Sequence, residues 1–200
     1  MIDNAAMFKL GYGLYLLTAK GAQDNGCIVN TAMQVTAAPN RVLVAVNKQN
    51  LTHDIIQYTK EFNLSVLTEG CPFGVYQHFG YQSGKKVDKF AGYKNCHRSE
   101  NGIYYLAEGA NAFLSGSVSD LIDCGTHTLF LADVTAAKVL GGENSVTYDY
   151  YQKHVKPKPE KTDKTGFRCK VCGYIYEGEE LPPDYICPLC KHGAQDFEKI

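Results

Sequence analysis

The sequence lacks an excess of charge of either sign. Its 200 residues include 20 Lys and Arg against 21 Asp and Glu, which gives a net charge of -1. A chain with this balance has no broad electrostatic attraction to the phosphates of nucleic acids or to an acidic membrane surface. We therefore expect neither as a partner.

Long hydrophobic runs are also missing. The apolar stretch from Leu10 to Leu17 is short, is interrupted by glycines and tyrosines, and lacks the cleavage signature of a secretory signal. We therefore expect a cytoplasmic protein without a membrane span. Thiols stay reduced in that compartment. The four cysteines scattered ahead of the C-terminal segment are accordingly expected to be free thiols: Cys27, Cys71, Cys96 and Cys124.

Two common phosphate-binding motifs are absent. Gly11-Tyr12-Gly13 is followed by Leu16 where a Rossmann fingerprint requires its third glycine. The run GYQSGKK at 80–86 has the wrong spacing for a P-loop and no Ser or Thr after its lysine. The sequence thus indicates neither of these nucleotide-binding folds.

The pattern of hydrophobic residues divides the chain. Periodicity continues to about Tyr151 and is followed by a Lys- and Pro-rich run, VKPKPEKTDKTG. We expect a first domain over 1–154, a linker over 155–166 and a small second domain over 167–200. Short strand-like runs broken by Gly, Asn and Pro predict a mainly β fold, a barrel or a sandwich, with a few helices. The predicted strands are 14–18, 41–47, 62–67, 112–118 and 128–134, and the predicted helices are 4–10, 52–59 and 72–79.

The C-terminal segment contains a strong metal-binding pattern. Cys169 and Cys172 enclose two residues, as do Cys187 and Cys190. Two thiolates at this spacing can converge on one ion, and two such turns complete a tetrahedral site made of sulfur alone. Iron and zinc both accept that geometry. Because the segment has few apolar residues, metal binding must supply much of its stability.

The residues around these cysteines distinguish the two metals. FRCKVCGYIY at 167–176 and LPPDYICPLC at 181–190 resemble rubredoxin, whose aromatic side chains surround a one-iron site. The insert between the cysteine pairs is shorter than in standalone rubredoxins and is more similar to rubredoxin domains fused to other redox proteins. The resemblance implies one iron ion, and a structural zinc ribbon used for protein docking is the alternative.

The segment at 25–56, NGCIVNTAMQVTAAPNRVLVAVNKQNLTHDII, resembles the flavin reductase-like family of FMN-binding split β-barrels. The resemblance extends from about Leu10 to Tyr151 and implies FMN as cofactor, NAD(P)H as electron donor and a homodimer. The residues implied to contact the flavin ring are Asn30, Thr31, Gln34, Val35 and Thr36. Those implied to hold ribityl and phosphate oxygens, near a helix start that favours anions, are Asn47, Lys48, Asn50 and Thr52. Without the resemblance, the latter cluster would be interpreted as a helix cap followed by a solvated lysine.

Two further stretches resemble the same family. In HFGYQSGKKVDKF at 78–90, Ser83 and Lys89 are implied to contact the phosphate, and Phe90 to pack beside them. In DCGTHTLF at 123–130, His127 matches a family histidine beside the flavin and nicotinamide sites and is the candidate catalytic residue. Thr126 stands where the family usually has Asp.

One aromatic position completes the set of expected flavin contacts. Tyr151 stands where family members return an aromatic residue toward the isoalloxazine ring. An aromatic residue at the end of the last periodic segment is also commonly just part of the core.

The two expected cofactors have complementary chemistry. A nicotinamide delivers two electrons as hydride, one iron ion accepts one electron, and a flavin can mediate between them. The combination resembles the high-molecular-weight rubredoxins of anaerobes, flavin reductase–rubredoxin fusions. That resemblance implies an NAD(P)H-dependent flavin oxidoreductase whose acceptor is a flavodiiron-type protein that reduces nitric oxide or oxygen. A reductase that supplies free reduced FMN to a monooxygenase is an alternative.

Overall fold

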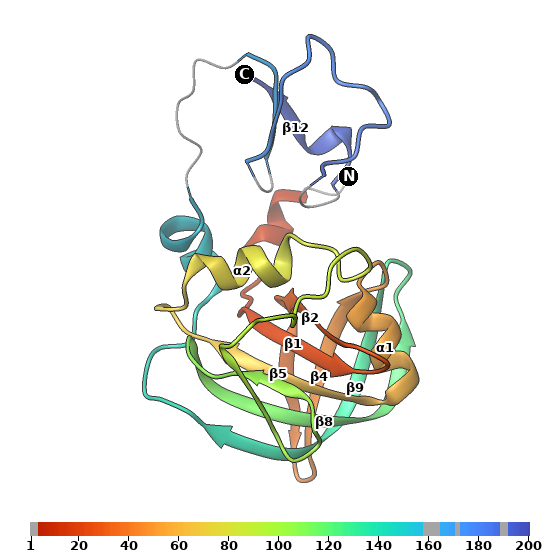
Figure 1. The fold of residues 1–200 in the computed structure, drawn as a ribbon, viewed down its shortest axis with the longest axis vertical. Helices are drawn as coiled ribbons and strands as arrows, with labels where there is room; N and C mark the ends of the chain where they lie inside the picture. The colour runs from red at the N-terminus through yellow and green to blue at the C-terminus, as the bar shows by residue number, and fades with distance from the viewer. Residues whose placement is uncertain (1–3, 158–164, 171–172, 189–191) are drawn as a thin grey trace.

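The computed structural model describes residues 4–157, 165–170, 173–188 and 192–200. A larger body of antiparallel strands is followed by a small C-terminal body (Figure 1). The main sheet has seven strands in the order β2-β1-β5-β8-β9-β4-β3. Its strands are β1 (Tyr15–Lys20), β2 (Asp24–Val29), β3 (Ala32–Ala37), β4 (Asn40–Asn47), β5 (Glu61–Leu67), β8 (Ala110–Asp123) and β9 (His127–Val139).

The connection between β2 and β3 forces this sheet to close. The two strands lie at opposite ends of the strand order, yet only Asn30 and Thr31 separate them in sequence. The three Cα–Cα steps from Val29 to Ala32 span at most about 11 Å, so the sheet must curl until its two edges approach each other. The closure is incomplete, because β2 and β3 remain the two ends of the strand order and no strand pairing joins them among the described residues.

Alternate residues of the strands face two different cores. On β1, Leu16 is buried in a cluster outside the barrel, and its neighbour Leu17 is buried in the barrel interior. This follows from the two-residue period of a strand, which points successive side chains to opposite faces. The interior cluster also contains Val44 of β4 and Phe130 of β9.

Helices close the barrel and cover one of its faces. Helix α1 (Leu51–Thr59) places Ile56, which is fully buried, in the interior cluster, and Lys60 ends the helix in the left-handed conformation. Helix α2 (Phe73–Gly80) buries one face on the outer cluster. The remaining elements of this body are η1 (Asn4–Lys9), β6 (Cys96–Arg98), β7 (Tyr104–Leu106), α3 (Tyr148–Tyr150) and η2 (Tyr151–Val155).

The C-terminal body has a very small core. Three short strands, β10 (Phe167–Cys169), β11 (Ile175–Tyr176) and β12 (Phe197–Lys199), lie in the order β11-β10-β12, and η3 (Ala194–Asp196) precedes the last. The buried members of its cluster are Cys169, Cys187 and Phe197, with tyrosines packed around them. A core of this size cannot stabilise a fold without a further crosslink or ligand.

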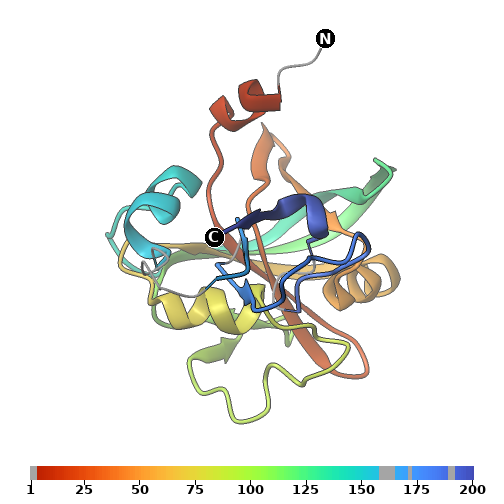
Figure 2. The same cartoon turned by 90° about the horizontal axis from the view of Figure 1, so that it is seen from above.

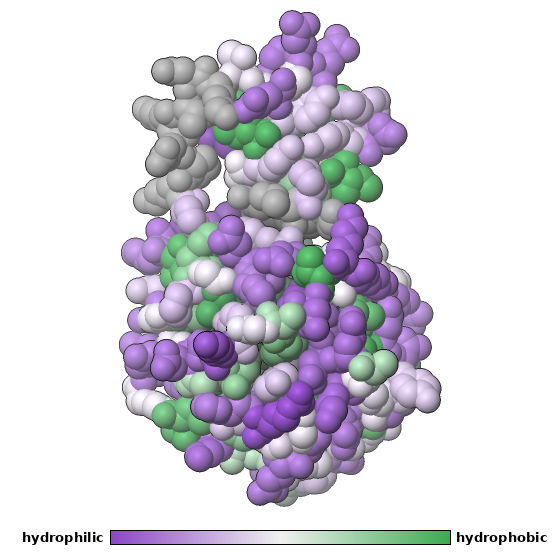
Figure 3. Space-filling model, in the orientation of Figure 1, coloured by the Kyte–Doolittle hydropathy of each residue, from purple (hydrophilic) through white to green (hydrophobic). Residues whose placement is uncertain are grey.

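The face of the molecule shown in Figure 3 is mostly hydrophilic. Figure 3 shows only small, separate hydrophobic patches on the face in view. Seen from above in Figure 2, η1 extends beyond the strands of the barrel, and Met7 and Leu10 at this end of the chain are exposed. Within the described ranges, no helix has the length and apolar character needed to cross a membrane.

The predicted mainly β fold is confirmed, with differences in individual elements. All five predicted strands exist, but β8 and β9 extend well beyond their predicted ends. The strands β2 and β3 were not predicted. Strand β2 begins with Asp24-Asn25-Gly26, which are typical turn residues, and β3 is largely exposed, so it lacks an alternating pattern. The first helix is a 3-10 helix.

The contribution of the outer core to stability can be tested with two leucines. Leu16 is 0% exposed and Leu10 is 53% exposed. We expect Leu16→Ala to lower the free energy of unfolding by about 2–5 kcal/mol, because it leaves a cavity. Leu10→Ala should change it by less than about 0.5 kcal/mol. Urea denaturation followed by circular dichroism measures both, and equal effects would contradict this assignment of the core.

Candidate functional site

A cavity of about 370 Å³ lies at the end of the barrel where β4 turns into α1. The β4–α1 turn and the start of α1 form one wall, and the segment that follows α2 forms another. Two residues of β2 and the side chain of Lys89 complete the lining. The lining residues used below are Asn25, Cys27, Asn47, Asn50, Thr52, Tyr81, Ser83, Gly84, Lys85 and Lys89.

The β4–α1 turn presents a helix N-terminus to this cavity. Asn47 Oδ1 accepts a hydrogen bond from the Gln49 N–H at 2.8 Å, and the Asn50 N–H donates to Asn47 O at 3.0 Å. Asn50 is the N-cap, but its side chain makes no capping bond. The first N–H groups of a helix have no acceptor within the helix and carry its positive dipole end. This geometry favours an anion in the cavity.

A buried amide beside the helix start lacks an acceptor. Asn25 is 1% exposed and its Oδ1 accepts a hydrogen bond from Thr52 Oγ1 at 2.9 Å. Its Nδ2 has no partner among the described residues. Gly84 packs so closely against this amide that a Cβ there would collide with it. An unsatisfied buried donor costs about 1–3 kcal/mol, so an oxygen-bearing ligand in the cavity would relieve that cost.

Lys89 brings a buried positive charge to the same cavity. It is 3% exposed, and its Nζ donates to Gly26 O and Phe79 O, each at 2.8 Å. Burial lowers the pKa of this ammonium. The described contacts use two of the three N–H donors of the group. Lys89 therefore ties the end of α2 to β2 and still has a donor for a ligand.

Two lysines at or near the cavity are paired with aspartates. Lys85 Nζ lies 3.2 Å from Asp54 Oδ2. Lys48, expected at the phosphate, is not among the lining residues, and its Nζ lies 2.6 Å from Asp123 Oδ1. That ion pair, together with the Gly125 N–H, lowers the pKa of Asp123. The structure thus brings Asn47, Asn50, Thr52, Ser83 and Lys89 to one cavity and places Lys48 elsewhere.

The strand register places three other expected residues beside Asn47. Asn47 pairs with His127 across β4 and β9, and the Ala45 N–H donates to Thr31 O at 3.0 Å. Asn30 and Thr31 are bonded to each other through their side chains at 3.1 Å. His127 Nδ1 lies 2.9 Å from Thr126 Oγ1, so Thr126 provides a hydrogen-bonding group where the family usually has Asp.

The remaining expected flavin contacts are divided between surface and core. Gln34, Val35 and Thr36 lie exposed on β3, the last strand in the order. Phe90 packs on Phe79 and Tyr104, with ring centroids 5.4 and 4.8 Å apart.

Tyr151 belongs to the outer core cluster. It is 6% exposed, and its hydroxyl lies 2.9 Å from that of Tyr81, which lines the cavity. Burial raises the pKa of Tyr151, so this hydroxyl stays protonated. Tyr151 therefore does not line the cavity, and its hydrogen bond to Tyr81 connects it to a residue that does.

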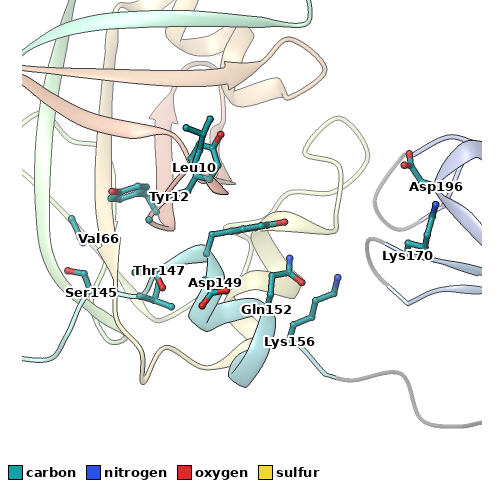
Figure 4. Close-up of a pocket in the computed structure, with 15 residues that line it drawn as sticks. Leu10, Tyr12, Val66, Ser145, Thr147, Asp149, Gln152, Lys156, Lys170 and Asp196 are labelled. Carbon is teal, nitrogen blue, oxygen red and sulfur yellow. The ribbon is translucent and has the colours of Figure 1, made fainter. Parts of the chain in front are cut away.

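A larger hollow of about 1210 Å³ lies between the barrel and the C-terminal body (Figure 4). Leu10, Tyr12, Thr147 and Asp149 line it from the barrel side, and Lys170 and Asp196 line it from the other side. None of the expected flavin contacts lines this hollow. Size alone therefore does not identify the cofactor site.

Two of the four cysteines of the predicted metal site fall within the described residues. Cys169 and Cys187 are 1% and 0% exposed and belong to the same small cluster. Gly173 has a φ of +81°, and its N–H donates to Cys169 O at 2.9 Å. Cys172 and Cys190 lie outside the described residues. The two buried cysteines fit a metal site with thiolate ligands.

The sequence interpretation missed several residues of the cavity. Asn25, Gly84 and Lys85 line it. All three lie in segments that resemble the family, Asn25 at the start of 25–56 and Gly84 and Lys85 within 78–90, but the resemblance assigns them no contact. No local sequence signal identifies them, because they reach the cavity through the pairing of β2 and through the path of the segment after α2.

Comparison with known proteins defines the class. Residues 7–158 match the family described as flavin reductase like domain, and residues 167–198 match the rubrerythrin, rubredoxin-like domain. The chain is thus an oxidoreductase of the flavin reductase type, in which the barrel takes a flavin and the small domain takes iron.

Individual relatives narrow this assignment. High molecular weight rubredoxin of Moorella thermoacetica is 38% identical over an alignment that covers 100% of both chains. Ferric-chelate reductase (NAD(P)H) of Archaeoglobus fulgidus is 32% identical, over 84% of this chain and 100% of that one. NADH:FAD oxidoreductase of Streptomyces globisporus superposes with a TM-score of 0.65 at 24% identity, over 74% of this chain and 90% of that one, which shows a shared fold. The chain belongs to the flavin reductase-like family, in the branch with a C-terminal rubredoxin-like domain.

The structural role of Lys89 can be separated from its role toward a ligand. We expect Lys89→Met to lower the free energy of unfolding of the flavin-free protein by about 1–3 kcal/mol, because two buried carbonyls lose their donor. Lys86→Met, at an exposed position three residues earlier, should have almost no effect. Urea titration of both variants is the measurement. An unchanged midpoint for Lys89→Met would show that the two carbonyl bonds contribute nothing.

Proposed function

We propose that the protein passes electrons from NAD(P)H through FMN to a single iron ion held by four cysteines, and from there to a protein acceptor. The cavity at the start of α1 carries this proposal, because it combines a helix N-terminus, a buried lysine and a buried amide without an acceptor. These are groups that a phosphate dianion would satisfy.

The phosphate and ribityl part of FMN fits this cavity by its chemistry. Thr52, Ser83 and Asn47 supply polar side chains, and Lys89 supplies a buried charge. The adjacent residues Asn30, Thr31 and His127 would then flank the isoalloxazine ring, with Gln34, Val35 and Thr36 along β3. When bound, the flavin would accept a hydride and release single electrons, which one iron ion can take up.

The role of the barrel residues is to bind and orient. The cavity groups fix the phosphate end, and His127 stands at the start of β9, one strand across from Asn47. His127 is oriented by Thr126 Oγ1 through Nδ1, so its Nε2 is the ring nitrogen that would face a nicotinamide. In the C-terminal domain, Cys169, Cys172, Cys187 and Cys190 would hold the iron.

We also propose a homodimer and a flavodiiron-type acceptor. Strand β3 is the end strand of the order and exposes Met33 and Val35 at 55% and 42%. A second copy of the chain on this strand would cover those side chains and the outer side of the flavin. The acceptor is proposed from the resemblance to the flavin reductase–rubredoxin fusions.

Anaerobic titration with NADH tests the proposal while the visible spectrum is recorded. The flavin and the ferric thiolate bands should both bleach in the protein as purified. In Cys187→Ser, we expect the iron band to be lost and reduction of the flavin to persist, because the two cofactors lie in separate domains. Cys124→Ser, at an exposed cysteine that does not line the cavity, is the matched control and should behave as the wild type.

Three outcomes would contradict the proposal. Colourless protein that contains zinc alone would support the structural zinc ribbon. Bleaching of the flavin with the iron left oxidised would remove the link between the two domains. Loss of reduced FMN on anaerobic gel filtration would favour a reductase that supplies free flavin to a monooxygenase.

A further inference from the structure

A buried histidine lies behind the cavity and does not line it. His53, at the third position of α1, is 4% exposed, and both of its ring nitrogens have partners. Nε2 lies 2.9 Å from Thr128 Oγ1, which is itself buried on β9, and Nδ1 lies 3.0 Å from Asp54 Oδ1. Its ring also packs against Phe130, with ring centroids 5.6 Å apart.

These contacts connect three elements that lie around the cavity. Thr128 follows His127 on β9, which pairs with β4 next to the β4–α1 turn. Asp54 Oδ2 lies 3.2 Å from Lys85 Nζ, and Lys85 lines the opposite wall. The chain Thr128–His53–Asp54–Lys85 thus runs from the barrel, through the first turn of α1, to the segment after α2.

The first turn of α1 is held by two buried side-chain bonds. Thr52 bonds to Asn25 on β2, and His53 bonds to Thr128 on β9. Adjacent residues of a helix point about 100° apart, so the two bonds restrain the turn from different sides. A helix held in this way cannot rotate about its axis or move away from the barrel without breaking a buried polar contact.

We propose that His53 is a positioning residue for the flavin phosphate, which it never touches. By anchoring the first turn of α1 to Thr128 and, through Asp54, to Lys85, it holds the N–H groups of the helix start and the segment after α2 around one anion. This inference rests on the proposed FMN site. A histidine with a purely structural role would stabilise the fold but would not change the preference for FMN over riboflavin, which lacks the phosphate.

The test compares affinities for FMN and for riboflavin, which lacks the phosphate. Flavin-free protein is titrated with each, and fluorescence quenching gives the two dissociation constants. In the wild type FMN should bind more tightly. We expect His53→Leu to reduce the preference for FMN by about tenfold, the effect of one lost buried hydrogen bond, with riboflavin binding little changed. His53→Gln, which can still reach Thr128, should restore part of the preference.

Thr128→Val gives an independent measurement that preserves side-chain shape. Like His53→Leu, it should reduce the preference for FMN over riboflavin. In the double variant the two effects should not add, because both substitutions remove the same hydrogen bond. If His53→Leu does not fold, Thr128→Val decides the question. Thr59→Val is the matched control, because it removes a hydroxyl bonded to Ile55 O at 3.0 Å at the other end of the same helix.

The outcomes separate the inference from the function on which it rests. A wild type without preference for FMN over riboflavin would reject the phosphate site itself. A wild-type preference that His53→Leu and Thr128→Val leave unchanged would reject the role of His53 alone. An equal loss of preference in Thr59→Val would show a general effect of weakening the helix and would also reject that role.

Discussion

The closure of the sheet through Asn30 and Thr31 is the constraint on which the rest of the structure depends. Because β2 and β3 are the two ends of the strand order, this short connection bends the sheet into a barrel and brings Asn25 on β2 near the start of α1. The cavity is a consequence of that closure. A flat sheet with the same strand pairs would separate Asn25 from Thr52 and leave no enclosed place for an anion.

The two domains are stabilised by different physical means. The barrel buries large side chains such as Phe62, Phe130 and Leu64 in its interior, and apolar burial contributes about 25 cal/mol per Å². The C-terminal domain buries chiefly two cysteines and Phe197. Its stability therefore depends on the metal that the cysteines hold. Loss of the metal should unfold this domain and leave the barrel folded. The two domains are therefore independent in stability although they belong to one chain.

The sequence predicts best where one residue type has one physical role. The cysteine spacing predicts a metal site in the segment that matches the rubredoxin-like domain, and the short strand-like runs predict the β fold. The cavity is harder to predict because its members are distant in sequence, and Asn25, Gly84 and Lys89 meet only after the sheet has closed. Lys48 shows the limit of prediction from the resemblance. The resemblance places Lys48 at the phosphate, whereas in the structure its side chain forms an ion pair with Asp123 and does not line the cavity. His53 carries no sequence signal, since its role depends on Thr128 of a strand far along the chain.

Joining the two domains in one chain has a physical consequence for electron transfer. A tether makes the encounter of two centres intramolecular, at an effective concentration in the millimolar range for a short flexible linker. The two matched regions, 7–158 and 167–198, belong to one chain, so the proposed flavin site and the proposed iron site are always held together. With both centres in one chain, the barrel needs no strong affinity for the small domain, because the linker supplies the proximity. Under the proposed function, a weak contact that forms and breaks quickly serves turnover better than a tight one, since the same small domain must also reach an acceptor.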